Sequence, residues 1–178
     1  MTSQVTLVTG PTRSGKSEWA EHLAQQTGAA VVYVATAQQD PRDRDWQQRI
    51  NAHRDRRPPH WHTREVPIEL PAALTQAQPG ECWLIDALGT WVANTLDWPD
   101  ADWDTQQTAL IAALTQTPAQ FILVAEETGW GVVPAYPLGR QFRDRLGTLT
   151  RRVAAIANPA YLVVAGYAID LRRVGRQV

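Results

Sequence analysis

The chain has 178 residues, of which 44% are hydrophobic and 20% charged, and its formal net charge is −1. This composition predicts one globular domain over residues 1–178, and the net charge produces no overall positive field that would favour binding to nucleic acid or an anionic membrane. No apolar run approaches the length of a membrane-spanning helix, and the single cysteine, Cys82, excludes an internal disulfide and favours a cytoplasmic location.

The first predicted element is a buried strand over the β-branched, apolar residues 5–9. It runs into a segment with the spacing G-x-x-x-x-G-K-[ST] of a phosphate-binding P-loop, and an amphipathic helix is predicted from residue 18. The P-loop consists of Gly10, Pro11, Thr12, Arg13, Ser14, Gly15, Lys16 and Ser17. Strand, loop and helix aim backbone N–H groups at an anion. Lys16, the only lysine in the chain, is expected to reach the β- and γ-phosphates, and the Ser17 hydroxyl is expected to ligate Mg²⁺.

A polar helix is predicted between Pro41 and Pro58. Arg49, His53 and Arg57 recur at every fourth residue, so they lie on one face of this helix. The flanking guanidiniums disfavour the imidazolium form, and a neutral imidazole could act as a nucleophile or general base while the arginines hold phosphate. A solvated charged helix with an incidental histidine fits the same residues equally well.

Asp86 ends an apolar strand predicted over residues 81–86. In a P-loop protein, a carboxylate at this place orients or coordinates Mg²⁺. The loop 128–137 follows another apolar strand, and its glycines, prolines and apolar residues are typical of a substrate-facing loop. His60 and His62 have no third ligand nearby, so an alternating strand is a better interpretation than a metal site.

The other segments complete an alternation of strands and helices. Strands are predicted over residues 30–35, 60–66, 121–125 and 161–165, and helices over residues 67–77, 88–96 and 138–156 and between Asp104 and Pro118. Residues 97–102 are predicted to form an acidic loop, and Arg145 is predicted to be an exposed ion. The Arg-rich tail is predicted to be a frayed end. About five apolar strands therefore predict an α/β fold, a doubly wound, mostly parallel P-loop NTPase-like sheet with helices on both faces.

Three motifs, spread over about residues 4–167, resemble one enzyme family. The first is the Arg-Ser-Gly-Lys-Ser core of the P-loop. The second joins residues 32–37 (Val-Tyr-Val-Ala-Thr-Ala) to residues 49–58, which begin Arg-Ile-Asn-Ala-His. The third joins residues 127–134 (Glu-Thr-Gly-Trp-Gly-Val-Val-Pro) to residues 140–144. In this order and spacing, the chain is similar to the bifunctional adenosylcobinamide kinase/adenosylcobinamide-phosphate guanylyltransferase family of cobalamin biosynthesis.

The resemblance implies two reactions. Such enzymes phosphorylate the aminopropanol hydroxyl of adenosylcobinamide with ATP or GTP, then transfer GMP from GTP to adenosylcobinamide phosphate and release pyrophosphate. The second reaction passes through a GMP–histidine intermediate, and the histidine corresponds to His53 here. The likeness thus favours the catalytic interpretation of His53, with Lys16 as its catalytic partner, GTP, ATP and Mg²⁺ as cofactors, and a homotrimer as the assembly.

The resemblance also implies binding residues. Ala35, Thr36 and Ala37 correspond to nucleotide contacts, Arg54, Asp55, Arg56 and Arg57 to contacts with the guanylyl group, and Glu65 and Asp86 to further nucleotide contacts. Four positions depart from the pattern, because relatives carry His, Glu, Asn or a polar amide where this chain has Ala52, Asp86, Glu126 and Thr150. Two other classes stay open: a simple P-loop small-molecule kinase, which would not need His53, and a non-enzymatic GTP-dependent switch.

Overall fold

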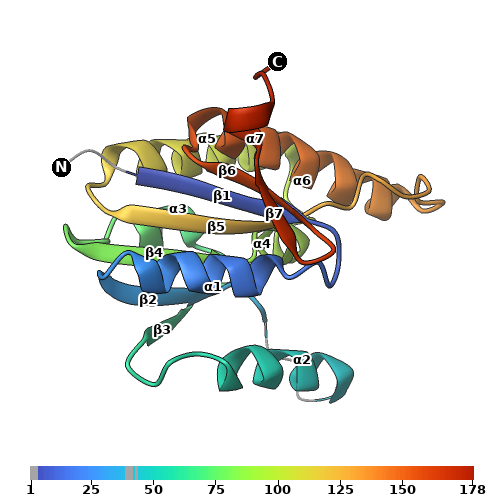
Figure 1. The fold of residues 1–178 in the computed structure, drawn as a ribbon. Helices are drawn as coiled ribbons and strands as arrows, with labels where there is room; N and C mark the ends of the chain where they lie inside the picture. The colour runs from blue at the N-terminus through green and yellow to red at the C-terminus, as the bar shows by residue number, and fades with distance from the viewer. Residues whose placement is uncertain (1–3, 39–41, 43) are drawn as a thin grey trace.

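A single sheet organises the computed structural model, which describes residues 4–38, 42 and 44–178 (Figure 1). Its strands are β1 (Gln4–Gly10), β2 (Ala30–Ala35), β3 (His62–Glu65), β4 (Glu81–Asp86), β5 (Gln120–Glu126), β6 (Ala160–Val164) and β7 (Tyr167–Asp170). Their spatial order is β3-β2-β4-β5-β1-β6-β7. Every neighbouring pair is parallel except β6 and β7.

Helices cover both faces of this sheet (Figure 1). They are α1 (Lys16–Gln26), α2 (Arg44–Asp55), α3 (Leu70–Leu74), α4 (Leu88–Asn94), α5 (Asp100–Gln116), α6 (Pro137–Ile156) and α7 (Leu171–Val174). α1 packs on one face through Ala20 and Ala24, whereas α3 to α6 bury their apolar residues on the other. α2 lies beyond the β3 edge of the sheet (Figure 1). The predicted α/β class, with a doubly wound, mostly parallel sheet, is confirmed.

The alternation of side chains along β1 separates the two layers of the core. Leu7 packs with the layer of α5 and α6, and Val8 packs with α1. Because β1 and β5 are parallel, Gly10 lies opposite Glu126 in the register, and Ala35 of β2 lies opposite Asp86 of β4. The carboxyl ends of these four strands therefore meet at one edge of the sheet, beside the P-loop.

The C-terminal segment differs from the predicted frayed tail. Residues Tyr167–Asp170 form β7, which pairs antiparallel with β6, and residues Leu171–Val174 form α7. Ala165 and Gly166 make the turn between the strands with positive φ values of 50° and 80°. A strand of four residues carries too short an alternation to be recognised from sequence alone.

Three further expectations on this side of the sheet are wrong. α5 begins at Asp100 and not after a cap at Asp104, because carboxylates are favourable in the first turn of a helix. Arg145 is buried instead of exposed, and it pairs with Asp100 at 2.9 Å. The predicted helix 67–77 is also shorter, since α3 covers only Leu70–Leu74. Among the described residues, no helix is both long and apolar enough to cross a bilayer.

Candidate active site

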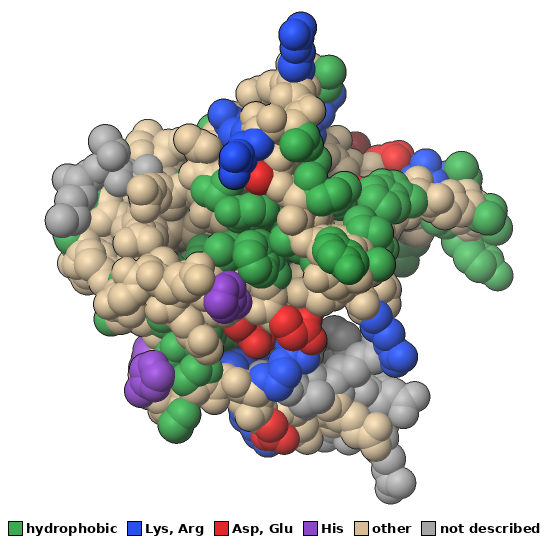
Figure 2. Space-filling view, viewed as in Figure 1, with side chains coloured by type: hydrophobic (Ala, Val, Ile, Leu, Met, Phe, Trp, Pro, Cys, Tyr) green, Lys and Arg blue, Asp and Glu red, His purple; other side chains and the backbone are tan. Residues whose placement is uncertain are grey.

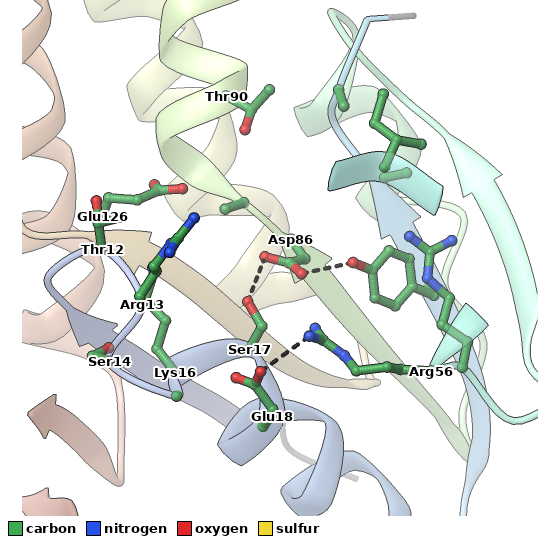
Figure 3. Close-up of a pocket in the computed structure, with 17 residues that line it drawn as sticks. Thr12, Arg13, Ser14, Lys16, Ser17, Glu18, Arg56, Asp86, Thr90 and Glu126 are labelled. Carbon is green, nitrogen blue, oxygen red and sulfur yellow. Dashed lines mark hydrogen bonds and ion pairs between the residues drawn. The ribbon is translucent and has the colours of Figure 1, made fainter. Parts of the chain in front are cut away.

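The P-loop borders a cavity of about 340 Å³ at the carboxyl edge of the sheet (Figure 3). The predicted site residues that line it are Thr12, Arg13, Ser14, Gly15, Lys16, Ser17, Ala35, Ala37, Arg56, Arg57 and Asp86. Tyr33, Ile50 and Glu126 line it as well, although no motif marked them as nucleotide contacts. Residues from β2, β4, β5 and the end of α2 therefore surround the loop, and we call this space the nucleotide cavity.

The backbone of the P-loop has the curvature that an anion cradle needs. Arg13 and Gly15 have φ values of 58° and 95°, in the left-handed region, and Gly15 directly precedes α1. Ser14 is buried, and its Oγ has no hydrogen-bond partner. A buried hydroxyl without a partner is costly, so its place in the cavity wall fits contact with a phosphate oxygen.

Gly10 and Pro11 lie outside the lining of the cavity. A Cβ atom at Gly10 would clash with the carbonyl oxygen of Val163 in β6 and would crowd the Ser14 hydroxyl. Glycine at this position therefore permits the close approach of β6 to the P-loop.

Asp86 connects the P-loop helix to the sheet. Its Oδ1 lies 3.4 Å from the Ser17 hydroxyl, and its Oδ2 accepts a hydrogen bond of 2.6 Å from the Tyr33 hydroxyl (Figure 3). Burial raises the pKa of Tyr33 well above its usual value, and the charge of Asp86 raises it further, so the phenol remains a donor. Hydroxyl and carboxylate oxygens suit Mg²⁺, which takes few protein ligands and completes its shell with phosphate and water. Within the described ranges, no cluster of three His, Cys, Asp or Glu side chains offers an alternative metal site.

The arginines after His53 take different positions. Arg57 stacks on Tyr33, with its guanidinium carbon 3.5 Å from the ring centroid, and its Nε is buried without a partner. Arg56 lines the cavity while it pairs with Glu18 at 3.0 Å and with Glu21 at 3.3 Å. Arg54 and Asp55, by contrast, are exposed and lie outside the lining.

The remaining predicted site residues either lie outside the lining of the cavity or have side chains that the structure does not describe. His53 belongs to α2 by its backbone, but its side chain and that of Arg49 lie outside what the structure describes. Ile50, one turn earlier in α2, lines the nucleotide cavity. Thr36 is fully buried outside the lining, where its hydroxyl donates to the Ala87 carbonyl at 2.7 Å. Glu65, at the end of β3, is exposed and also outside the lining.

Glu126 also lines the cavity, although in the sequence it is marked only as a departure from the family pattern. It ends β5, and one of its carboxylate oxygens accepts a hydrogen bond of 2.9 Å from the backbone N–H of Gly89. Burial raises the pKa of Glu126, Lys16 opposes this effect, and Asp86 adds to it. The signal that could have found it is its place after an apolar strand, the same place that marked Asp86.

Comparison with known proteins gives a match over nearly the whole chain. Residues 6–171 match the family model described as cobinamide kinase / cobinamide phosphate guanyltransferase. The chain is 42% identical over 168 residues to the bifunctional adenosylcobalamin biosynthesis protein CobP of Pseudomonas aeruginosa, covering 93% of this chain and 96% of that protein. It is 37% identical over 181 residues to the bifunctional adenosylcobalamin biosynthesis protein CobU of Escherichia coli K12, covering 93% of this chain and 98% of that protein.

Solved structures with little sequence identity share the fold. One is a prototypical ATPase from the type III secretion system of pathogenic bacteria, with a TM-score of 0.55, 10% identity, and coverage of 98% of this chain and 58% of that one. Another is the assembled ATPase EscN of enteropathogenic E. coli, with a TM-score of 0.56, 11% identity, and coverage of 97% and 44%. At this identity the likeness concerns the P-loop NTPase-like fold alone. Because the family match extends from β1 to the start of α7, P-loop included, the chain belongs to the cobinamide kinase / cobinamide phosphate guanyltransferase family of bifunctional enzymes.

Proposed function

We propose that this enzyme phosphorylates the aminopropanol hydroxyl of adenosylcobinamide with ATP or GTP and then transfers GMP from GTP to adenosylcobinamide phosphate. The observation that carries the proposal is the nucleotide cavity, in which Lys16, Ser17 and Asp86 meet inside a chain that matches this family. The products are adenosylcobinamide-GDP and pyrophosphate.

Phosphoryl transfer in P-loop enzymes depends on positioning and on charge neutralisation. Backbone N–H groups of residues 12–17 and the Lys16 ammonium would hold the phosphates, and the unpartnered Ser14 hydroxyl adds a donor. Ser17 and Asp86 would hold Mg²⁺, which neutralises charge on the phosphate oxygens when it is bound. Tyr33 fixes the Asp86 carboxylate for this task through its hydrogen bond.

The guanylyl transfer needs a nucleophile, and we assign this role to His53. Ile50, Arg56 and Arg57 line the nucleotide cavity, which supports a position for the C-terminal half of α2 near the α-phosphate. Arg57 has a buried Nε without a partner, so it is suited to hold the transferred phosphate. Attack by a neutral imidazole would leave GMP on the protein and release pyrophosphate, which predicts ping-pong kinetics.

Radiolabelled GTP tests the proposal. With label at the α-phosphate, we expect wild-type protein to acquire label that is stable to base and labile to acid, and His53→Asn to acquire none. His62→Asn, on an exposed position of β3, is the matched control and should label normally. A wild-type protein that transfers the γ-phosphate to adenosylcobinamide but never acquires α-label would be a simple kinase, and one that does neither would be a GTP-dependent switch.

We also propose that the chain is a single cytoplasmic domain that assembles as a homotrimer. Figure 2 shows hydrophobic side chains gathered over β7 and at the projecting end near the start of α6. They include Trp130, Val132 and Tyr136, which are 61%, 93% and 79% exposed, and Tyr167, which is 77% exposed. Exposed apolar surface of this kind favours contact between subunits. Light scattering of the purified protein tests the assembly, and Trp130→Ser with Tyr136→Ser should shift it toward monomer.

A further inference from the structure

A second cavity lies on the other side of the P-loop strand. Its volume is about 630 Å³, and its walls are the carboxyl ends of β1 and β5 and one face of α6. We call it the α6 cavity. Leu7 and Thr9 of β1 line it, and the Thr9 hydroxyl donates to Glu127 at 2.9 Å. This volume is within the range of small-molecule sites.

Two polar groups in the wall of the α6 cavity lack partners. Thr150 is only 8% exposed, and its hydroxyl has no hydrogen bond. Arg143, on the same helix, is half-buried, and its Nη1 atom is buried without a partner. Both residues line the cavity. Leaving such groups unpaired is costly, so their presence in one cavity indicates a ligand with hydrogen-bonding groups.

The charges in the wall point to the class of that ligand. Three carboxylates, from Glu126, Glu127 and Asp144, face two guanidiniums, from Arg143 and Arg151. This balance disfavours a triphosphate, which needs an excess of positive charge. It suits a neutral polar ligand that both donates and accepts hydrogen bonds, as the amide arms of a cobinamide do.

Glu126 joins the two cavities. It lines the nucleotide cavity and the α6 cavity, and it lies opposite Gly10 in the register of β1 and β5. A ligand held in the α6 cavity therefore meets the phosphate end of a bound nucleotide at this residue. Phosphoryl transfer requires the acceptor and the phosphoryl donor to lie next to each other in this way.

We propose that the α6 cavity is the acceptor site, in which Arg143 and Thr150 bind the amide-bearing part of cobinamide and direct its aminopropanol hydroxyl past Glu126 toward the nucleotide. This assignment rests on the function proposed above and adds the place and the residues of acceptor binding. It gives Arg143 and Thr150 roles in affinity for the corrinoid and none in affinity for the nucleotide.

Titration calorimetry with adenosylcobinamide, on protein without nucleotide, tests the site. We expect Thr150→Val to weaken binding roughly three- to tenfold and Arg143→Met roughly ten- to a hundredfold, as for the loss of a neutral and of a charged hydrogen bond. Arg152→Met is the matched control, because Arg152 is on the same helix but outside the cavity and donates to Thr108 at 3.2 Å. It should bind adenosylcobinamide like the wild type, and all three variants should bind GTP like the wild type.

Folding does not confound this test. Thr150→Val removes a buried hydroxyl that has no partner, so the melting temperature of the ligand-free variant should not fall. Unchanged corrinoid binding in both cavity variants, or weaker binding of GTP instead, would overturn the acceptor site alone. A wild-type protein that neither binds nor phosphorylates adenosylcobinamide would overturn the proposed function, and the acceptor site with it.

Discussion

The Tyr33 hydroxyl donates a hydrogen bond of 2.6 Å to Oδ2 of Asp86, joining β2 to β4 at the floor of the nucleotide cavity. The same tyrosine ring carries the guanidinium of Arg57, 3.5 Å from its centroid. One buried aromatic residue thus positions both the carboxylate suited to Mg²⁺ and an arginine suited to phosphate. The sheet fixes the position of Tyr33 relative to Asp86, because β2 and β4 are parallel neighbours.

Tyr33→Phe removes only this hydroxyl. We expect the variant to lose about 1.5–3 kcal/mol of unfolding free energy, the range for hydrogen bonds to charged groups. The Mg²⁺ concentration for half-maximal kinase activity should rise several-fold, because Asp86 is no longer held. Urea unfolding and a Mg²⁺ titration measure the two effects, with Tyr161→Phe as the control. An unchanged Mg²⁺ requirement would show that Tyr33 does not position the metal ligand.

Gly10→Ala tests whether the first glycine of the P-loop serves packing. An added Cβ would clash with the carbonyl oxygen of Val163, which belongs to the backbone and cannot turn away. We expect a loss of about 1–3 kcal/mol in the unfolding free energy, as in other cases of overpacking. Gly147→Ala, in α6 with nothing within 4 Å of the new Cβ, should instead gain about 0.5–1 kcal/mol. Equal effects of the two substitutions in urea unfolding would contradict this account.

Glu126 should make stability depend on pH. Burial raises its pKa in the folded protein, so the folded state holds this proton more tightly than the unfolded state. Its contribution to stability is therefore lost as the pH rises from about the ordinary value of 4.5 through the raised pKa. Glu126→Gln, measured without nucleotide, should lack this decline relative to wild type. Parallel stability profiles of the two proteins between pH 4 and 8 would refute the assignment.

The sequence predicts those features that depend on residues close to one another along the chain. The P-loop follows from a fixed spacing between a strand and a helix, and Asp86 from its place after an apolar strand, so both were found. β7 was missed because four residues become a strand only by pairing with β6. Glu126 was not recognised as a wall of two cavities, since that role depends on the order of β5 and β1 in the sheet. The sequence does not predict the burial of Arg145, because no local pattern shows which carbonyl groups lie across from α6.

Arg145 provides the last prediction, because its burial is explained by what it binds. The guanidinium donates to the carbonyl oxygens of Thr95, Leu96 and Trp98 at 2.7–3.2 Å, and so it closes the connection between α4 and α5. Arg145→Met keeps much of the side-chain volume but removes the guanidinium donors, and of the three carbonyls that of Thr95 keeps the backbone N–H of Trp98 as a partner at 3.2 Å. We expect a loss of about 3–5 kcal/mol in unfolding free energy by urea titration, as for other broken buried charge networks. Arg152, on the same helix, makes one exposed hydrogen bond, to Thr108, so Arg152→Met should change the unfolding free energy by less than about 0.5 kcal/mol. A loss of less than about 0.5 kcal/mol in Arg145→Met as well would mean that Arg145 contributes only as a surface charge does.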